Sequence, residues 1–196
     1  MKLDFIEIGT SDFRTLAFDP TKTGIIVEPV KVYLDNIPNR EGLVKIHAAI
    51  VNDPNIDSVT VYYNDPKVIE AHNLPQWVRG FNSVSNPHPT ITKMFGNIKD
   101  LVKTDQVNAV TLDELLDEVT EVNLLKIDTE GMDVYIMQRF FEMETRPKVN
   151  EIQFESNSLN DLNILTHVKA LALINGYTVE DRVVRGTNET VLKLKA

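Results

Sequence analysis

Short apolar runs alternate along the chain with longer stretches of mixed polarity, as in an α/β fold. These runs predict six strands, at residues 5–8, 24–27, 44–51, 58–63, 124–128 and 149–155. Residues 58–63 alternate apolar with polar side chains, which indicates a half-exposed strand. Helical spacing predicts helices over residues 111–119, 132–141 and 162–174. Two last strands, 177–184 and 190–194, flank an Arg185-Gly186-Thr187-Asn188 turn and predict a terminal hairpin.

Local signals mark the ends of the helices. Thr111 is an N-cap candidate with Glu114 three residues later, which is a capping box, and Asn175-Gly176 stops the helix over 162–174. Residues 64–97 instead contain four prolines and two glycines, which predicts a long irregular connection. Long connections in compact domains are often functional lids. We therefore expect one domain, residues 1–196, with 64–97 as a lid or acceptor-site insertion.

Composition narrows the class of protein. The chain has 196 residues, 42% of them hydrophobic, which suits one globular domain. The net charge of −9 argues against nucleic acid as a partner, and the lack of cysteine excludes disulfides, thiolate catalysis and cysteine-bound zinc. No apolar run reaches the roughly 18 residues of a membrane span. With no signal segment before the first strand, we expect a cytoplasmic protein or a domain cut from a longer one.

Acidic residues gather at the end of the strand over 124–128, in Leu124-Leu125-Lys126-Ile127-Asp128-Thr129-Glu130-Gly131. Ligands of open α/β sheets bind at the carboxyl ends of strands, so Lys126, Asp128 and Glu130 are candidate catalytic residues. Glu155 ends the neighbouring strand and could join them. The alternatives are a structural ion pair for Lys126 and Asp128, and a favourable charge at a helix start for Glu130.

Two further chemical roles come from the same region and the expected lid. Asp128, Glu130 and Glu155 offer carboxylate oxygens of the kind that Mg²⁺ or Mn²⁺ prefers, so they form a candidate metal site. His88, in Asn86-Pro87-His88-Pro89, is a candidate base, although a lone loop histidine is usually solvated. Trp77 could stack on a sugar or simply pack within the lid.

The first two strands end in residues suited to a nucleoside ligand. Glu7-Ile8-Gly9-Thr10-Ser11-Asp12 contains a glycine that lets the backbone turn sharply. Glu28-Pro29 ends the second strand about 20 residues later, the separation at which an acid reaches ribose hydroxyls. The glycine cluster that holds a pyrophosphate is missing, which disfavours NAD or FAD and favours an adenosyl ligand without phosphates. The alternative is a plain turn with capping acids.

These segments together resemble the FkbM-type methyltransferase family. The resemblance rests first on Val110-Thr111-Leu112-Asp113-Glu114-Leu115-Leu116 followed by the segment 124–131. Residues 5–9 resemble the first S-adenosylmethionine motif, Val27-Glu28-Pro29 the ribose-binding acid and its proline, and His47-Ala48-Ala49 the small-residue turn beside the adenine. Asn175-Gly176-Tyr177 resembles the glycine-tyrosine pair before the terminal hairpin. One departure is Phe13, where the family usually has a second glycine.

The resemblance implies a Rossmann-like class I fold, a seven-stranded, mostly parallel sheet with an antiparallel C-terminal hairpin. It implies S-adenosyl-L-methionine as cofactor, held by a set of strand-end residues: Glu7, Gly9, Thr10, Ser11, Asp12, Glu28, Pro29, Ala48, Ala49 and Asp128. The implied reaction is O-methylation of a sugar, with a deoxysugar such as rhamnose as the preferred acceptor and a glycosyltransferase domain as a fused or separate partner. Asp128 is the first candidate for the base, with Glu155 and His88 as alternatives.

Three other functions stay open at this point. The chain could methylate a metabolite that is not a sugar. It could be a catalytically silent domain that keeps the fold and the ligand, which Phe13 favours. It could be a nicotinamide-dependent enzyme, against which the missing phosphate loop speaks.

Overall fold

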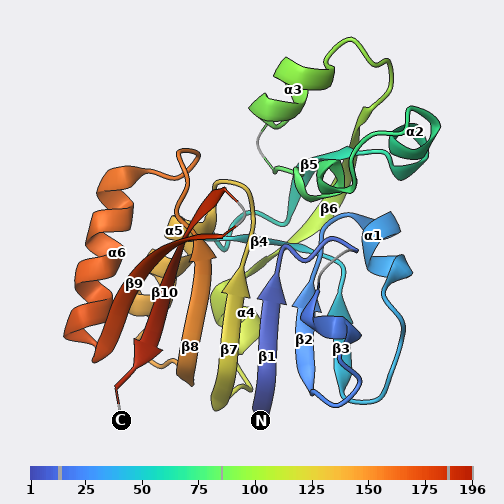
Figure 1. Ribbon diagram of the computed structural model, residues 1–196. Coiled ribbons are helices and arrows are strands. Elements are labelled where there is room, and N and C mark those ends of the chain that lie inside the picture. Colours follow the sequence, from blue (N-terminus) through green and yellow to red (C-terminus); the bar gives the residue numbers. More distant parts are fainter. Residues whose placement is uncertain (13–14, 85, 185, 196) are drawn as a thin grey trace.

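A seven-stranded sheet forms the centre of the computed structural model, which describes all residues except 13–14, 85, 185 and 196 (Figure 1). Its strands are β1 (Lys2–Ile8), β2 (Gly24–Val27), β3 (Leu43–Ile46), β7 (Glu121–Ile127), β8 (Lys148–Glu155), β9 (Tyr177–Val184) and β10 (Thr187–Leu194). They lie in the order β3-β2-β1-β7-β8-β10-β9, and only β10 runs in the opposite direction to the other strands. The predicted α/β fold, with a mostly parallel sheet and a C-terminal hairpin, is confirmed. Thr187 and Asn188, expected in the turn, belong to β10, and Arg185 is outside the described residues.

The order of the sheet reverses beside β1. β2 pairs with one side of β1 and β7 with the other, both in parallel. Beyond the last paired residues the backbone contact continues, because the N–H of Asp128 donates to the carbonyl of Ile8 at 2.9 Å. Such a reversal is the topological switch point at which α/β proteins bind ligands.

Three helices pack on one face of this sheet: α4 (Leu112–Leu116), α5 (Asp133–Glu142) and α6 (Leu162–Ile174). Their apolar residues share a core with alternate residues of the strands, such as Ile6, Leu125 and Phe154. The capping box predicted at Thr111 and Glu114 is present, with both reciprocal hydrogen bonds formed. The opposite face of β1 and β2 carries the short helices η1 (Leu16–Phe18) and α1 (Lys31–Asn36) over a smaller apolar cluster.

A second sheet holds β4 (Ala49–Val51), β5 (Ser58–Asn64) and β6 (Val102–Thr111), in the order β4-β6-β5. The single strand predicted over 44–51 is therefore two strands, β3 and β4, which belong to different sheets. β6 was not predicted, because polar residues such as the half-exposed Lys103 and the exposed Gln106 leave no clear apolar run along it. The described residues between 58 and 111, from β5 to β6, are called the cap lobe below.

The cap lobe is folded, so the prediction of an irregular connection over 64–97 was wrong. It contains α2 (Pro66–Ala71), η2 (Gln76–Gly80) and α3 (Pro89–Phe95). Two of its prolines begin helices, at the position where a missing N–H costs nothing. Four aliphatic side chains are almost fully buried together: Ile69, Val78, Ile91 and Leu101. Each contributes roughly 1.5–3 kcal/mol when buried, which offsets part of the conformational entropy lost when the lobe becomes ordered.

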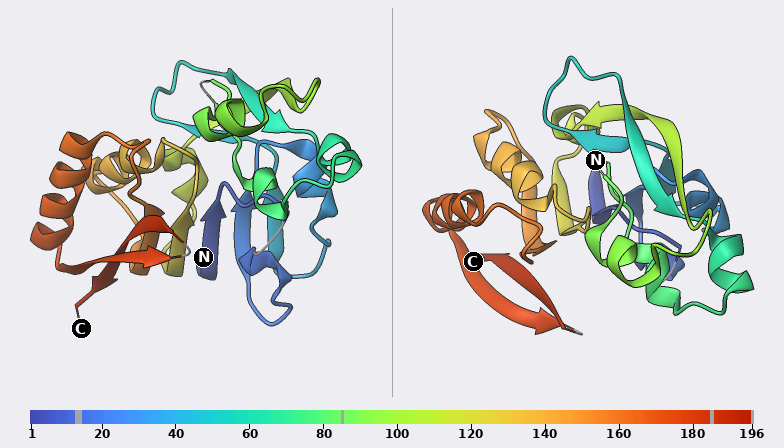
Figure 2. Two further views of the ribbon diagram at one scale, coloured as in Figure 1. Left: turned by 45° about the horizontal axis from the view of Figure 1, so that its top comes forward. Right: turned by 90° about the horizontal axis from the view of Figure 1, so that it is seen from above.

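The cap lobe lies over the carboxyl ends of the parallel strands, at the top of the molecule in Figure 1. The left view of Figure 2 brings this end of the molecule toward the reader. A third apolar cluster joins it to the main sheet through α1, with Tyr33 and Val30 packed against Val61 and Val107. The hydroxyl of Tyr33 also donates to the carbonyl of Asn64. Within the described residues, no helix has the length and apolar character needed to cross a membrane.

Candidate functional site

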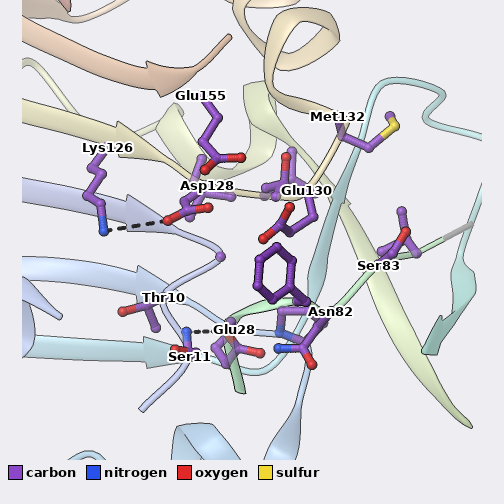
Figure 3. A pocket seen from close by; sticks show the side chains of 18 of the residues that line it. Thr10, Ser11, Glu28, Asn82, Ser83, Lys126, Asp128, Glu130, Met132 and Glu155 are labelled. Carbon is purple, nitrogen blue, oxygen red and sulfur yellow. Dashed lines mark hydrogen bonds and ion pairs between the residues drawn. The ribbon is translucent and has the colours of Figure 1, made fainter. Parts of the chain in front are cut away.

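A cavity of about 910 Å³ lies between the carboxyl ends of the parallel strands and the cap lobe (Figure 3). Its size is at the upper end of the usual range for ligand pockets, roughly 300–1,000 Å³. Three groups of residues line it: strand-end loops (Ile8–Ser11, Val27–Pro29, Ala48–Ile50, Asp128–Glu130), cap-lobe residues (Trp77, Gly80–Val84, Thr90, Met94) and residues of β8 to β10 (Gln153, Glu155, Arg182, Glu189). The cavity is thus placed at the switch point of the sheet.

Gly9 allows the close approach of two strand ends at the floor of the cavity. Its φ is +75°, and a Cβ built there would lie 2.0 Å from the carbonyl oxygen of Asp128. Any other residue would have to push β7 away from β1. The sharp turn predicted at Gly9 is therefore required by packing as well as by backbone conformation.

Glu28 is held rigidly at the end of β2. One carboxylate oxygen accepts the backbone N–H of Ser11 at 2.7 Å, and the other accepts that of Val30 at 2.8 Å (Figure 3). The residue is only 2% exposed, and burial raises the pKa of its carboxyl to about 7. Each oxygen keeps a lone pair for a further donor, so Glu28 can accept hydrogen bonds from a ligand without moving.

Glu7 is also buried, but its carboxylate is engaged within the protein rather than in the lining of the cavity. It accepts hydrogen bonds from the Lys126 ammonium at 2.7 Å, the Thr15 hydroxyl at 2.6 Å and the Leu16 N–H at 2.9 Å. Lys126 lines the cavity and lies 4.0 Å from Asp128. The lysine therefore links a structural acid to an acid of the site.

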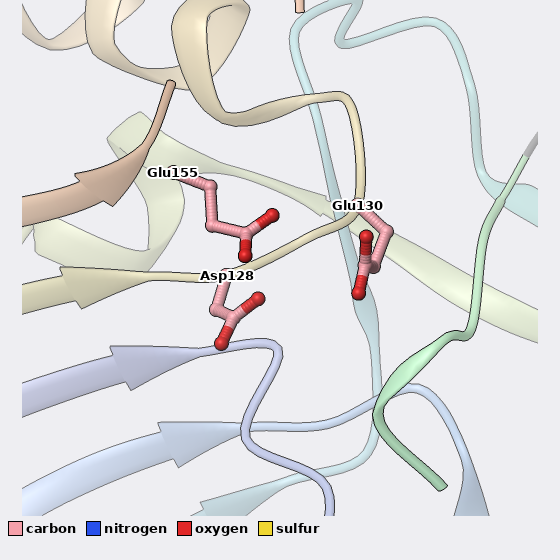
Figure 4. Close-up of side chains that lie close together, drawn as sticks. All are labelled: Asp128, Glu130 and Glu155. Carbon is pink, nitrogen blue, oxygen red and sulfur yellow. The ribbon is translucent and has the colours of Figure 1, made fainter. Parts of the chain in front are cut away.

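Asp128, Glu130 and Glu155 converge, as the candidate metal site required (Figure 4). One oxygen from each lies within 4.8 Å of the others. Burial raises the pKa of Asp128 to about 7 against the lowering effect of Lys126, and nearby acids such as Asp133 add to the rise. Burial, with repulsion from Asp128 and Glu130, raises the pKa of Glu155 to about 9. The pKa of Glu130 rises in the same direction for the same reasons. The cluster therefore favours a proton or another cation between its members.

The turn after β7 aims Glu130 at the cavity. Glu130 has a φ of +54°, in the left-handed region that residues with a side chain seldom adopt. The buried carboxylate of Asp133 holds this turn by accepting the Thr129 N–H at 3.3 Å, the Thr129 hydroxyl at 3.1 Å and the Gly131 N–H at 3.3 Å. The strained backbone thus has a specific support at the start of α5.

His88 reaches the acidic cluster from the cap lobe. Its Nε2 lies 3.3 Å from an oxygen of Glu130, and both side chains are more than nine-tenths buried, at 3% and 8% exposure. Its Nδ1 accepts the N–H of Thr90 at 3.2 Å, and its ring centroid lies 4.4 Å from that of Phe81. Of the predicted candidates for a base, His88 is the one that lies behind Glu130 rather than in the lining of the cavity.

The remaining predicted cofactor residues divide into two groups. Thr10, Ser11, Pro29, Ala48 and Ala49 line the cavity. Asp12 does not, and its carboxylate accepts hydrogen bonds from Arg79 of the cap lobe at 2.7 Å and Asn36 at 2.6 Å. Phe13, the departure from the family pattern, is outside the described residues.

Several lining residues were not predicted from the sequence. Gln153, Arg182 and Glu189 face the cavity from β8, β9 and β10, where Arg182 donates to Glu189 at 3.1 Å. Asn82 belongs to the cap lobe. Only the register of the sheet, which pairs Glu155 with Glu189 and Glu189 with Arg182, reveals that these residues share a face. Asp133, which supports the turn after β7, was not predicted either. Its signal in the sequence is that an acid follows two residues after Gly131.

Comparisons with known proteins identify the family of the chain. The family model described as the methyltransferase FkbM domain matches residues 7–177. No curated protein matches the chain. Among solved structures, a human methyltransferase 10 domain containing protein is similar at 11% identity and a TM-score of 0.42, over 100% of this chain and 72% of that one. Since the family model covers most of its length, the chain belongs to the FkbM methyltransferase family.

Proposed function

We propose that this protein is an S-adenosylmethionine-dependent O-methyltransferase that acts on a hydroxyl of a sugar. One observation carries the proposal: a single cavity at the switch point has the fixed acid Glu28 at one end and the cluster of Asp128, Glu130 and Glu155 at the other. Membership of a methyltransferase family supports the reaction class. The cytoplasmic location and a glycosyltransferase partner stay predictions from the sequence.

Glu28 is the proposed anchor of the cofactor, through hydrogen bonds from the ribose hydroxyls to its carboxylate. The fit is supported by its two fixed oxygens and by the buried Thr10 hydroxyl beside it, which has no hydrogen-bond partner within the part of the chain that the structure describes. Bound S-adenosylmethionine would supply a methyl group on a positively charged sulfur. An acidic cavity suits that charge.

Calorimetric titration with S-adenosylhomocysteine tests the anchor. Glu28→Ala should weaken binding by roughly 2–3 kcal/mol, the scale of a hydrogen bond to a charged group. Glu28→Gln, which keeps one carbonyl oxygen, should lose less, and Glu41→Ala at an exposed site is the control. Thermal melts separate lost affinity from lost folding. Unchanged affinity in a folded Glu28→Ala protein would refute the placement.

Asp128 is the proposed base. As the acceptor oxygen forms its bond to the methyl carbon and the carbon–sulfur bond breaks, the hydroxyl proton passes to the carboxylate of Asp128. The other contribution of the protein is to hold the two reactants together in one cavity. Lys126, 4.0 Å away, offsets the negative charge that Asp128 carries before it takes the proton.

The sugar acceptor is supported by the side chains of the cap lobe. Trp77 and Phe81 line the cavity close to one another, with centroids 5.3 Å apart, and can pack against the apolar face of a ring. Carboxylates and Asn82 can bind hydroxyls. The net charge of −9 disfavours polyanions. Among sugars, a deoxysugar such as rhamnose within a glycan is the first candidate to try.

Transfer of a labelled methyl group to separate pools of oligosaccharide, small metabolites, protein and nucleic acid tests the acceptor class. Label in oligosaccharide alone is the expected result. Label confined to the metabolite pool would support a non-sugar acceptor. Cofactor binding without transfer to any pool would support the silent binding domain.

A divalent cation is a second candidate for the role of activating the hydroxyl. Asp128, Glu130 and Glu155 fit Mg²⁺ or Mn²⁺ by their oxygen ligands, and one buried oxygen of Glu130 has no partner among the described residues other than His88, whose Nε2 lies 3.3 Å away. There a cation would lower the pKa of the acceptor hydroxyl. EDTA should then abolish transfer and added Mg²⁺ or Mn²⁺ should restore it, whereas full activity in EDTA supports Asp128 as base.

A further inference from the structure

The placement of His88 separates two roles within one side chain. As the N-cap of α3, it accepts the Thr90 N–H at Nδ1, 3.2 Å away. On the other side of the ring, Nε2 lies 3.3 Å from Glu130. The face of the ring packs on Phe81. The cap lobe therefore holds the imidazole on three sides, with only Nε2 directed toward the acidic cluster.

The contact with Thr90 decides where the imidazole carries its proton. A nitrogen that accepts a hydrogen bond has a free lone pair, so a neutral ring must carry its hydrogen on the other nitrogen. Nε2 is then an N–H group, with no lone pair to take a proton from a substrate or to bind a metal. This removes His88 from the candidates for the base.

We propose that His88 is a positioning residue whose Nε2–H donates to Glu130 and so fixes the third carboxylate of the acidic cluster from the cap lobe. This rests on the proposed function. Neither Nε2 of His88 nor this oxygen of Glu130 has another hydrogen-bond partner among the described residues. The distance of 3.3 Å exceeds the roughly 2.8 Å of charge-assisted hydrogen bonds, and a small rotation of either side chain shortens it.

The contact makes the geometry of the site depend on the cap lobe. Glu130 stands on a strained turn, and its backbone supports come from α5, whereas the donor to its side chain comes from α3. With the lobe displaced, Glu130 loses its donor while Asp128 and Glu155, at the ends of β7 and β8, keep their places. The lobe thereby completes the cluster, whether that cluster takes up a proton or a cation.

Two substitutions separate the roles of the imidazole. His88→Asn keeps a short side-chain acceptor for the Thr90 N–H, and asparagine is among the best N-cap residues, but its amide does not reach Glu130. His88→Gln has an amide N–H at about the reach of Nε2 and loses the close cap. If the role of His88 were only to cap α3, His88→Gln would be the more damaging change.

The first measurement needs no acceptor. In ¹⁵N-labelled protein with S-adenosylhomocysteine, two-bond ¹H–¹⁵N correlations of the imidazoles report which nitrogen is protonated, and His88→Asn assigns the signal. We expect an unprotonated Nδ1 and a protonated Nε2 whose shift changes in Glu130→Gln. A proton on Nδ1, or an Nε2 signal that ignores Glu130→Gln, overturns the proposal even if the protein proves to be a sugar methyltransferase.

The second measurement uses methyl transfer to the oligosaccharide pool. His88→Asn should lower kcat about 10–100-fold, as loss of an outer hydrogen bond does at metal and acid sites, with cofactor affinity unchanged. His88→Gln should recover most of the rate. In the Glu130→Gln background His88→Asn should cost little more, because the partner is already changed. Equal losses in both backgrounds, or a worse His88→Gln, overturn the proposal. If the wild-type protein transfers no methyl group, the proposed function is refuted. The tautomer measurement then decides whether His88 donates to Glu130.

Discussion

Asp128 shows how one residue can be structural through its backbone and chemical through its side chain. Its N–H binds Ile8, and its carbonyl lies where only a glycine at position 9 leaves room. These contacts hold the residue at the switch point. Its side chain is left to face the cavity, in an environment that raises the pKa of the carboxyl to about 7. A carboxyl with that pKa is well matched to proton transfer near neutral pH.

Turnover should therefore depend on Asp128 and on pH together. Since a base must be deprotonated, kcat should increase as the pH is raised through about 7 and should be low in more acidic solution. Asp128→Asn should lower kcat by a factor of roughly 10²–10⁴ and should abolish its pH dependence, without loss of folding or cofactor binding. Initial rates between pH 5.5 and 8.5 provide the check, with Asp117→Asn at an exposed site as control. Near-normal turnover in Asp128→Asn would move the role to Glu155.

Single residues of the site could be predicted where a strand ends. Glu28, Asp128 and Glu155 follow apolar runs, so their position at one edge of a parallel sheet follows from the fold class. The inward direction of Glu7 could not be deduced, because a strand buried on both faces gives no sign of which side is the cavity. His88 was found as a residue, but its orientation depends on the N-cap of α3, which the prediction of an irregular segment left out.

At the scale of elements, the cap lobe is the part least visible in the sequence. Prolines at helix starts resemble the prolines of loops, and the four buried aliphatic residues of its core are far apart in the chain. β6 completes its sheet with few apolar positions. β2 of the main sheet, by contrast, is buried along its whole length, so it has a continuous apolar run that the sequence reveals.

Ligand binding should slow hydrogen exchange only in the part of the cap lobe that lines the cavity. Hydrogen exchange should slow within residues 77–84 when S-adenosylhomocysteine and an acceptor are added, because Trp77 and residues 80–84 line the cavity. α2 lies outside the lining and serves as an internal control. Exchange that is already slow at 77–84 in the free protein would identify the lobe as a rigid part of the scaffold.

For the whole molecule, buried acids should set how stability varies with pH. Folded protein holds protons on Glu28 and Asp128 up to pH about 7 and on Glu155 up to about 9, whereas the unfolded chain releases them near pH 4. Between these limits the folded state binds more protons, so the free energy of unfolding falls as pH rises. Exposed acids such as Asp35 have a lowered pKa and act in the opposite direction, but only in more acidic solution.

Urea unfolding at pH 5 and pH 8 measures this effect. The protein should be more stable at pH 5, and Glu28→Gln should flatten the difference, since its amide does not titrate. Added Mg²⁺ should raise stability at pH 8 if the acidic cluster binds it. Equal stability at the two pH values would show that water or ions reach these carboxyls in solution.

The position of Trp77 makes its fluorescence a reporter of ligand binding. It is the sole tryptophan of the sequence, and it lies in the lining of the cavity against Phe81 and Phe95. Its emission under selective excitation therefore comes from one known place, 5.3 Å from the centroid of Phe81. A ligand that fills the cavity should displace water from the indole and shift this emission to shorter wavelength, without any label. Candidate acceptors could then be screened by fluorescence alone. Trp77→Phe, which has no tryptophan emission, is the control.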